Sequence, residues 1–355
     1  MNNIDDIKLI EKIDSSNMRK LLREFPSQID KVVRLIASFE LPDNYKKVNN
    51  IIVCGLGGSS VGGDLLKNFL RGKSQIPLIV NRSYTLPRWV GENSLVLCVS
   101  YSGNTEETLS VYDEGKKRRS KMVAITSGGK LYESATRDGI PVFSIPEIGI
   151  PPRTALGYLF MPQLLLMKKL QIADFQDSEI SEMFDVLKHV AEEIDISVPK
   201  DKNEAKKIAE GICQSIPLVY TTSDFFEGVG IRWKTQLNEN SKSPAYCEFF
   251  PELDHNEIMG WEGFKKLTKQ FSVILLRDKN ESERMRRRID VTVSLIKEKA
   301  ERVMEVYPKG EGLLSRILSL IYIGDYVSFY LAMLNGIEPV EVKSISSLKR
   351  RMAGQ

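Results

Sequence analysis

The order of hydrophobic and polar positions predicts alternating strands and helices along the first half of the chain. Short apolar runs that do not alternate with polar residues are separated by polar or amphipathic stretches of helix length. Such uninterrupted runs are typical of strands buried on both faces of a parallel sheet. After a helical lead-in, the expected strands are 50–55, 77–80, 95–99, 122–126 and 141–145, with helices over 61–70 and 106–120.

The same pattern returns in the second half. A helix expected over 177–194 is followed by the polar stretch 198–202, after which strands and helices alternate again. The strands are expected at 216–222, 245–249, 271–276 and 303–306, and the helices at 226–238, 281–298 and 312–334. The pattern predicts an α/β protein with two tandem doubly wound domains, residues 1–176 and 177–355, each a mostly parallel sheet flanked by helices.

Charge narrows the range of partners. The 355 residues carry 50 Lys and Arg against 47 Asp and Glu, a net charge of +3, so the chain lacks a strong basic field. The basic run 284–288 has Glu281 and Glu283 beside it and no interleaved aromatic residues, which is typical of a solvated helix face. Nucleic acid is therefore not expected as a partner.

Membrane insertion and export are not expected either. The apolar stretch 317–334 contains Gly324, Asp325 and Ser328, so a membrane span would bury a carboxylate, and we expect a buried or interface helix. The N-terminus lacks the charged-then-apolar pattern of a secretory signal. The four cysteines are scattered with no close pair, which fits reduced thiols in the core of a cytoplasmic protein: Cys54, Cys98, Cys213 and Cys247.

A glycine-rich turn, 55–63, lies between the first expected strand and helix, where backbone N–H groups and the helix dipole favour an anion. A dinucleotide-binding turn would need glycine at position 60, where Ser60 stands, and an acidic residue after the second strand, where Asn81 and Arg82 stand. A Walker loop would need Gly-Lys-Ser or Gly-Lys-Thr, which the turn lacks. Close packing of the helix on the sheet is an alternative reason for the glycines.

A second loop, 100–108, also follows a strand and opens a helix. Ser100, Ser102 and Thr105 supply hydroxyls that, with the first N–H groups of the helix, can surround a dianionic phosphate. Alternatively, Ser102 or Thr105 only caps the helix. Because loops after parallel strands gather at the carboxyl edge of a sheet, both loops can face the same crevice.

Gly57-Gly58-Ser59 and residues 100–108 together resemble the signature of the sugar isomerase (SIS) domain. Three further motifs resemble the bifunctional phosphoglucose/phosphomannose isomerase family: Pro151 to Tyr158, Asn238-Glu239-Asn240 and Leu253 to Glu257. The resemblance implies two tandem SIS domains in a homodimer that interconverts glucose 6-phosphate or mannose 6-phosphate with fructose 6-phosphate, with no cofactor.

The resemblance also implies roles for individual residues. Ser100, Ser102 and Thr105 would hold the phosphate. Glu239 would be the base that moves a proton between C1 and C2, although any one of 47 acidic residues can also be a plain exposed glutamate at a helix end. The residues expected to line the substrate are Gly57, Gly58, Ser59 and Tyr101.

The two histidines differ in context. His189 lies outside the apolar face of its expected helix, so we expect it to be a solvated surface residue. His255 lies in a polar turn where an imidazole can be oriented for acid–base work near neutrality. The resemblance implies that it assists ring opening from the neighbouring subunit. Alternatively, Asp254 or Asn256 caps the next helix and His255 is incidental.

Two cations complete the implied site. Arg153 follows Pro151 and Pro152, which stiffen the backbone, and the resemblance implies that its guanidinium stabilises the enediolate. A surface arginine at a helix start would oppose the helix dipole. Near the C-terminus, Lys349 is implied to approach the sugar ring. Lys343 is its rival, and a solvated terminal lysine is a further alternative.

Three other functions are alternatives to a metal-independent isomerase of both sugars. An unrelated group of mannose phosphate isomerases uses zinc held by several imidazoles and carboxylates, a shell that two separated histidines cannot readily supply, so no metal is expected. SIS domains also serve as phosphosugar sensors with a fused effector, for which the two halves leave little room. An isomerase limited to glucose 6-phosphate, or acting on another phosphosugar, is the alternative within the enzyme class.

Overall fold

The computed structural model describes residues 2–352, which divide into two compact units. The first unit contains residues 23–184 and 224–228, and the second contains residues 2–22, 185–223 and 229–352. The division falls inside helix α8 (Asp177–Glu193) and groups the first residues of the chain with the second unit. The domain boundary expected at 176/177 stays a prediction.

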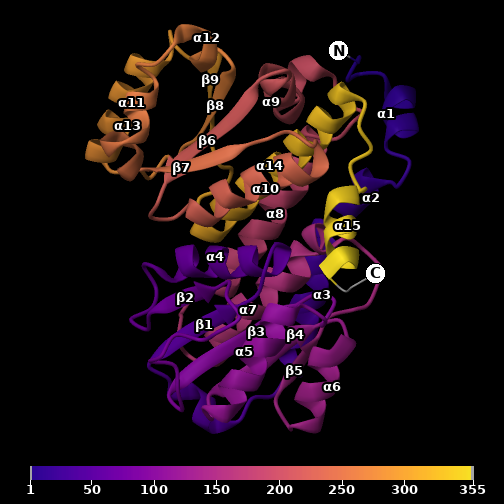
Figure 1. Ribbon diagram of the computed structural model, residues 1–355, viewed down its shortest axis with the longest axis vertical. Coiled ribbons are helices and arrows are strands. Elements are labelled where there is room, and N and C mark those ends of the chain that lie inside the picture. The colour runs from indigo at the N-terminus through magenta and orange to yellow at the C-terminus, as the bar shows by residue number, and fades with distance from the viewer. Residues whose placement is uncertain (1, 353–355) are drawn as a thin grey trace. The chain divides into compact units, whose positions relative to one another are not determined.

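The first unit is built on a five-stranded parallel sheet with the order β2-β1-β3-β4-β5. In its centre, Cys54 of β1 lies opposite Cys98 of β3, so the two strands end side by side (Figure 1). The strands are β1 (Asn50–Cys54), β2 (Leu78–Asn81), β3 (Ser94–Ser100), β4 (Lys121–Thr126) and β5 (Val142–Ser144). They confirm the five strands expected from the uninterrupted apolar runs.

Helices cover both faces of this sheet, as the buried runs predict (Figure 1). Ile52 and Val96 belong to an apolar cluster with residues of α5 (Glu106–Lys117) and α6 (Gly129–Arg137) on one face. Val53 and Val80 face α4 (Gly58–Leu70) on the other. Helix α7 (Leu156–Lys169) packs against both α4 and α3 (Phe25–Ala37), and short 3-10 turns lie at η1 (Asp43–Lys46) and η2 (Pro152–Thr154).

The second unit repeats the architecture with four parallel strands in the order β7-β6-β8-β9. The first strand in sequence again lies between the second and the third, and the fourth follows the third, as in the first sheet. The strands are β6 (Ile216–Thr222), β7 (Tyr246–Phe250), β8 (Phe271–Leu276) and β9 (Arg302–Val306). The two related α/β sheets expected from the sequence are therefore confirmed.

Helix α14 (Leu313–Asn335) is the central helix of the second unit and is buried from Leu314 to Leu334. Within residues 2–352 it is the one helix long and apolar enough to cross a membrane, and its burial confirms the expectation of a buried helix. The start of the chain packs beside it, since the Asn2 side chain donates to the Met333 carbonyl across 3.0 Å. Lys206 reaches back to Asp5 across 2.9 Å.

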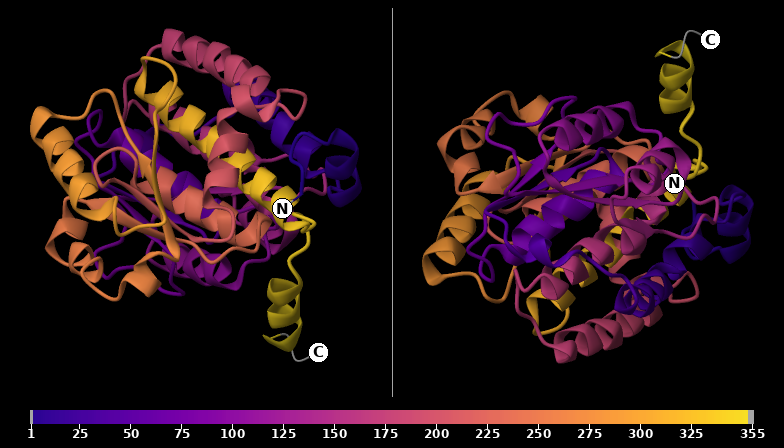
Figure 2. Two further views of the ribbon diagram at one scale, coloured as in Figure 1. Left: turned by 90° about the horizontal axis from the view of Figure 1, so that it is seen from above. Right: turned by 90° about the horizontal axis from the view of Figure 1, so that it is seen from below.

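Most of the remaining helices of the second unit lie around its sheet, whereas α15 stands apart from it (Figure 2). The lead-in forms α1 and α2, and His189 of α8 is exposed and pairs with Glu193 across 3.3 Å, as expected for a surface residue. The ranges are α1 (Ile7–Ile13), α2 (Met18–Arg23), η3 (Lys200–Lys202), α9 (Glu204–Ile212), α10 (Glu227–Asn240), η4 (Glu252–His255), α11 (Glu257–Gly260), α12 (Lys265–Thr268), α13 (Glu283–Ile296) and α15 (Lys343–Met352).

Candidate active site

The turn after β1 brings Gly57, Gly58 and Ser59 to the carboxyl edge of the first sheet. Gly57 has φ +54°, and α4 begins at the next residue. A Cβ on Gly58 would lie 2.9 Å from the carbonyl oxygen of Pro152, so only glycine allows the backbone before Arg153 to come this close. Ser59 is buried. The turn is therefore in contact with the segment that carries Arg153.

The loop after β3 is organised by its own hydroxyls. Ser100 Oγ and Thr105 Oγ1 are 2.9 Å apart, and Ser100 Oγ accepts from the Gly103 N–H across 3.1 Å. Ser102 is exposed, and its Oγ accepts from the Asn104 N–H across 3.4 Å. Thr105 is the N-cap residue of α5, but its side chain makes no capping hydrogen bond. The alternative in which the Thr105 hydroxyl simply caps the helix is therefore wrong.

A third turn, 127–130 after β4, supports this loop and was not singled out from the sequence. The Ser127 N–H and hydroxyl both donate to the Tyr101 carbonyl, across 3.0 and 2.6 Å. The Lys130 N–H donates to Asn104 Oδ1 across 3.2 Å. Gly103, with φ +68°, is held so tightly that an added Cβ would lie 1.7 Å from the Gly128 oxygen. The sequence does contain a signal for this turn, because Ser-Gly-Gly-Lys follows a buried strand and begins a helix, as the glycine-rich residues of the first turn do.

Tyr101 and Glu106 bear on the electrostatics of the loop. The Tyr101 side chain is buried, and this burial raises the pKa of its phenol, so the group stays neutral at physiological pH. Glu106 and Glu107 lie in the first turn of α5, and the exposed Glu106 accepts from the Tyr84 hydroxyl across 3.5 Å. The positive end of the α5 dipole is therefore partly offset by carboxylates on the same turn.

Arg153 lies in the short turn η2 with 5 % of its surface exposed, so it is not the surface arginine of the alternative interpretation. The turn is closed by the Thr154 N–H and hydroxyl, which donate to the Pro151 carbonyl across 2.9 and 2.8 Å. A buried guanidinium needs partners that keep it charged and oriented. In the first unit, the residues predicted to bind substrate thus form one group around the ends of β1 and β3.

In the second unit, Glu239 is the penultimate residue of α10, and buried polar contacts hold that helix to α14. Arg232 forms a bidentate ion pair with Asp325 across 3.0 and 2.8 Å, and burial raises the pKa of Asp325 against the opposing effect of the guanidinium. The Trp233 indole N–H donates to the Leu320 carbonyl across 2.9 Å, and the Asn240 amide donates to Ser328 Oγ, also across 2.9 Å. The backbone of Glu239 is therefore well fixed.

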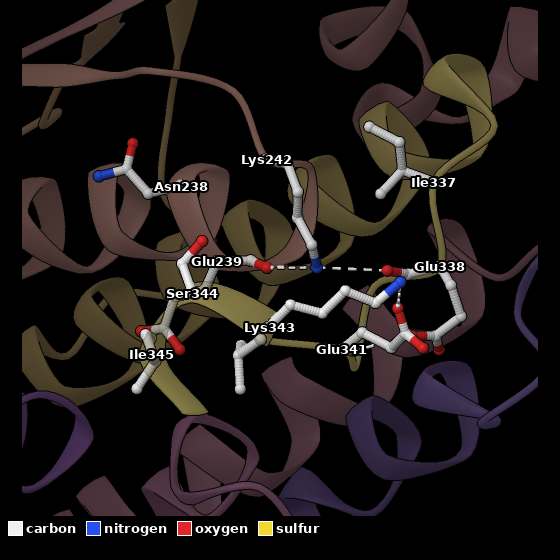
Figure 3. A pocket seen from close by; sticks show the side chains of 10 residues that line it. Asn238, Glu239, Lys242, Ile337, Glu338, Glu341, Lys343, Ser344 and Ile345 are labelled. Carbon is white, nitrogen blue, oxygen red and sulfur yellow. Dashed lines mark hydrogen bonds and ion pairs between the residues drawn. The ribbon is translucent and has the colours of Figure 1, made fainter. Parts of the chain in front are cut away.

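A cavity of about 670 Å³ opens beside this end of α10. One wall is formed by Asn238, Glu239 and Lys242, and the other by the segment from Ile337 to Ile345 (Figure 3). A cavity of this size suits a small polar metabolite. Charged side chains from both walls line it, namely Glu239 and Lys242 on one side and Glu338, Glu341 and Lys343 on the other.

Lys343 lines this cavity and pairs with Glu341 across 2.8 Å, which raises the pKa of Lys343. Lys349 lies in the last turn of α15, is exposed, and is not among the residues that line the cavity. None of the described α15 side chains is buried, and in both views of Figure 2 the helix stands away from the rest of its own unit. Lys349 and Lys343 both remain candidates for the lysine that approaches the sugar ring.

His255 ends the short turn η4 after β7 and is exposed. The turn is held from α13, because Asp254 accepts from Arg288 across 3.0 Å and from the Thr292 hydroxyl across 2.8 Å. Asn256 caps α11 by accepting from the Glu257 N–H, so one capping contact of the alternative interpretation is present. His255 does not line the cavity with Glu239.

Comparison with known proteins gives one consistent family. Residues 201–352 match the family described as the bacterial phospho-glucose isomerase C-terminal SIS domain. The bifunctional phosphoglucose/phosphomannose isomerase of Caldicellulosiruptor bescii is 43 % identical, over 92 % of this chain and 96 % of that protein. The enzyme of the same name from Aquifex aeolicus is 38 % identical, over 85 % and 90 %.

A solved structure adds support for the fold alone. The C-terminal domain of glucosamine-fructose-6-phosphate aminotransferase from Francisella tularensis aligns with a TM-score of 0.70 at 17 % identity, covering 91 % of this chain and 98 % of that one. The family match over residues 201–352 identifies the second unit as a SIS domain, and the likeness to the solved structure extends over both sheets. Together with the two relatives, which match nearly end to end, this means that the chain belongs to the bifunctional phosphoglucose/phosphomannose isomerase family of sugar phosphate isomerases.

Proposed function

We propose that the protein interconverts glucose 6-phosphate and mannose 6-phosphate with fructose 6-phosphate in the cytoplasm, through a cis-enediol or enediolate and without a metal ion. Its membership of the family supports the class of reaction, and the relative from Caldicellulosiruptor bescii is named for both activities. The observation that carries the mechanism is the position of Glu239, in a cavity wall at the end of a helix that buried contacts hold in place.

The reaction moves protons within one substrate. Glu239, as general base, removes the proton from C2 of the open-chain aldose while the C1 carbonyl oxygen gains a proton, which gives the enediol. Glu239 then returns a proton to C1 as the C2 hydroxyl loses its own, which gives the ketose. No electrons leave the substrate. Arg153 is proposed to stabilise the negative charge that builds on the two oxygens.

Binding and ring opening are assigned to the other predicted residues. Ser100, Ser102 and Thr105 are proposed to hold the phosphate, which fits a helix start whose N-cap side chain leaves the helix N–H groups uncapped. His255 and Lys349 are proposed to help open the sugar ring, with Lys343 as the alternative to Lys349. Residues proposed to line the substrate are Gly57, Gly58, Ser59 and Tyr101.

An assay of the purified, chelator-treated protein tests this proposal. Glucose 6-phosphate and mannose 6-phosphate are offered separately and fructose 6-phosphate is followed. Turnover of both sugars is expected, with a loss of about 100- to 10,000-fold in kcat for Glu239→Gln. The matched control is Glu210→Gln, a change at an exposed α9 glutamate that pairs with Lys200 across 2.8 Å.

The other outcomes identify the alternatives. Turnover of glucose 6-phosphate alone would narrow the substrate range to one aldose and keep the mechanism. Tight binding of fructose 6-phosphate without any turnover would favour a phosphosugar sensor. Activity that disappears with chelator and returns with added zinc would overturn the metal-free mechanism.

We also propose a homodimer in which His255 serves the partner's site. Light scattering is expected to give twice the chain mass of 40.2 kDa. Glu239→Gln and His255→Ala variants, each nearly inactive, should regain about a quarter of the wild-type activity when unfolded and refolded as a mixture, because half of the sites in mixed dimers are intact. No recovery in mixtures would mean that each site is made within one chain.

A further inference from the structure

Lys242 lies just beyond α10, three residues after Glu239, and its side chain reaches back over the end of the helix. Its ammonium donates to the carbonyl of Glu239 across 2.8 Å and also lies 3.4 Å from that of Asn240. It further donates to the carbonyl of Glu338 across 3.2 Å (Figure 3) and to that of Pro339 across 3.0 Å. One cation thus joins two segments that are nearly a hundred residues apart in the sequence.

The backbone at Lys242 is unusual for a lysine. Its φ of +53° lies in the left-handed region, where glycine is the favoured residue after a helix and where other residues cost about 1 kcal/mol or more. The gain that offsets this cost comes from the side chain, since an ammonium at the negative end of a helix dipole, with several carbonyl acceptors, is stabilised there. The presence of lysine at position 242 is therefore explained by the contacts of its side chain with the two segments and not by the preference of its backbone.

The two segments that it joins are the two walls of the cavity. The end of α10 carries Glu239, and the segment 338–341 leads directly into α15. That segment is itself closed by a hydrogen bond from the Glu341 N–H to the Glu338 carboxylate across 2.8 Å. Lys242 consequently sets the spacing between Glu239 and the start of the C-terminal helix.

We propose that Lys242 is a positioning residue for the isomerisation: it keeps Glu239 and the segment leading to α15 at a fixed separation across the cavity, without contacting substrate. This assignment rests on the proposed function, because it depends on Glu239 as the base. Misplacement of a reacting group by about 1 Å can cost about 100-fold in rate, so a tether of this kind matters more to kcat than to phosphosugar binding.

Four variants test the proposal. Lys242→Met removes the ammonium and keeps the length of the side chain, whereas Lys242→Gly also relieves the left-handed backbone, so its stability should be unchanged or higher. Lys242→Arg keeps the charge. Lys269→Met is the matched control. Lys269 also donates to a backbone carbonyl in the same unit, that of Ala300 across 2.7 Å, but Lys269 and Ala300 do not line the cavity.

The expected result is a split between kcat and KM. Lys242→Met and Lys242→Gly should lower kcat about 10- to 100-fold and change KM for the phosphosugar less than about threefold. Lys242→Arg should recover part of kcat, and Lys269→Met should retain it. Amide hydrogen exchange in peptides covering 337–342 should be faster in both Lys242→Met and Lys242→Gly than in the wild type.

Two results would overturn the assignment, and they are distinguishable. Normal kcat and unchanged exchange in Lys242→Gly and Lys242→Met, in a protein whose wild type is active, would overturn the positioning role and leave the proposed function intact. No turnover by the wild type would overturn the proposed function and the positioning role with it.

Discussion

The side-chain amide of Gln28 donates to the backbone carbonyl of Thr154 across 2.7 Å. The oxygen of the same amide accepts from the Gly157 N–H across 3.2 Å, and Gln28 is 1 % exposed. One buried side chain on α3 therefore holds the backbone at Thr154 and Gly157, on the C-terminal side of Arg153. The free-energy cost of losing it is large, because both backbone groups would be left buried without a partner.

Gln28→Leu should therefore lower the free energy of unfolding by about 2 kcal/mol or more, measured by urea denaturation. Gln28→Glu keeps an acceptor for the Gly157 N–H but places a buried carboxylate oxygen against the Thr154 carbonyl, so we expect a loss at least as large as that of Gln28→Leu at neutral pH. The exposed Gln176 gives the control, since Gln176→Leu should change stability by less than about 0.5 kcal/mol. Equal urea midpoints for the wild type and Gln28→Leu would contradict this account.

The buried ion pair between Arg232 and Asp325 leads to a second prediction. Asp325→Asn leaves the guanidinium charge buried without its counter-ion, so we expect a loss of about 3 to 5 kcal/mol in the free energy of unfolding. The double variant Arg232→Met with Asp325→Leu removes both charges and should recover most of that loss. A double-mutant cycle completed with the single variants Arg232→Met and Asp325→Leu, measured by chemical denaturation, gives the coupling energy. If the double variant is as unstable as the single one, packing and not charge is responsible.

The partly buried carboxylate of Asp138 gives a prediction about acid stability. The ammonium of Lys116 and the hydroxyl of Tyr112 both donate to it, across 2.7 and 2.8 Å, and they lower its pKa. A lowered pKa in the folded state means that this stabilisation is fully present above the unfolded pKa of about 4 and is lost as pH falls through the folded pKa. The difference in urea midpoint between the wild type and Asp138→Asn should shrink between about pH 5 and pH 2.5. A difference that stays constant over that range would exclude this linkage.

The four cysteines should differ clearly in the reactivity of their thiols toward Ellman's reagent. Burial raises the pKa of Cys54 to about 12 and the pKa of Cys98 well above its usual value, so neither thiol ionises near pH 8. Ellman's reagent should therefore reach them only after denaturation, whereas the partly exposed Cys213 and Cys247 are the thiols open to reaction in the folded protein. Rapid loss of Cys54 or Cys98 in the native protein would mean that the first sheet opens readily.

The strands were predictable because each is a short apolar run between turn residues, which is the strongest signal that a parallel sheet leaves in a sequence. All nine lie within about two residues of their expected positions. Helix α7 was not predicted, because it is apolar all round and has no helical period, and α9 was missed because it is short and follows a polar stretch.

The loops of the first unit that are proposed to bind substrate were predictable for a related reason: a strand, a turn rich in Gly or Ser and a helix are adjacent in the sequence. The side-chain contacts that Gln28 and Lys242 make with distant segments were not predictable, because the carbonyls that they bind lie 126 and 96 residues away in the sequence. Nothing in a local pattern identifies such partners. The supporting contacts of a site depend on the tertiary fold, whereas the loops themselves are local.

The packing of residues 2–22 with the second unit has a consequence for synthesis on the ribosome. Residues 23–184 form nearly all of the first unit and can fold as soon as they emerge, since domains fold largely as units from the N-terminus. Asn2, in contrast, pairs with Met333, and Asp5 pairs with Lys206. Asp5 therefore remains without this partner until Lys206 has been translated, and Asn2 until Met333 has been translated.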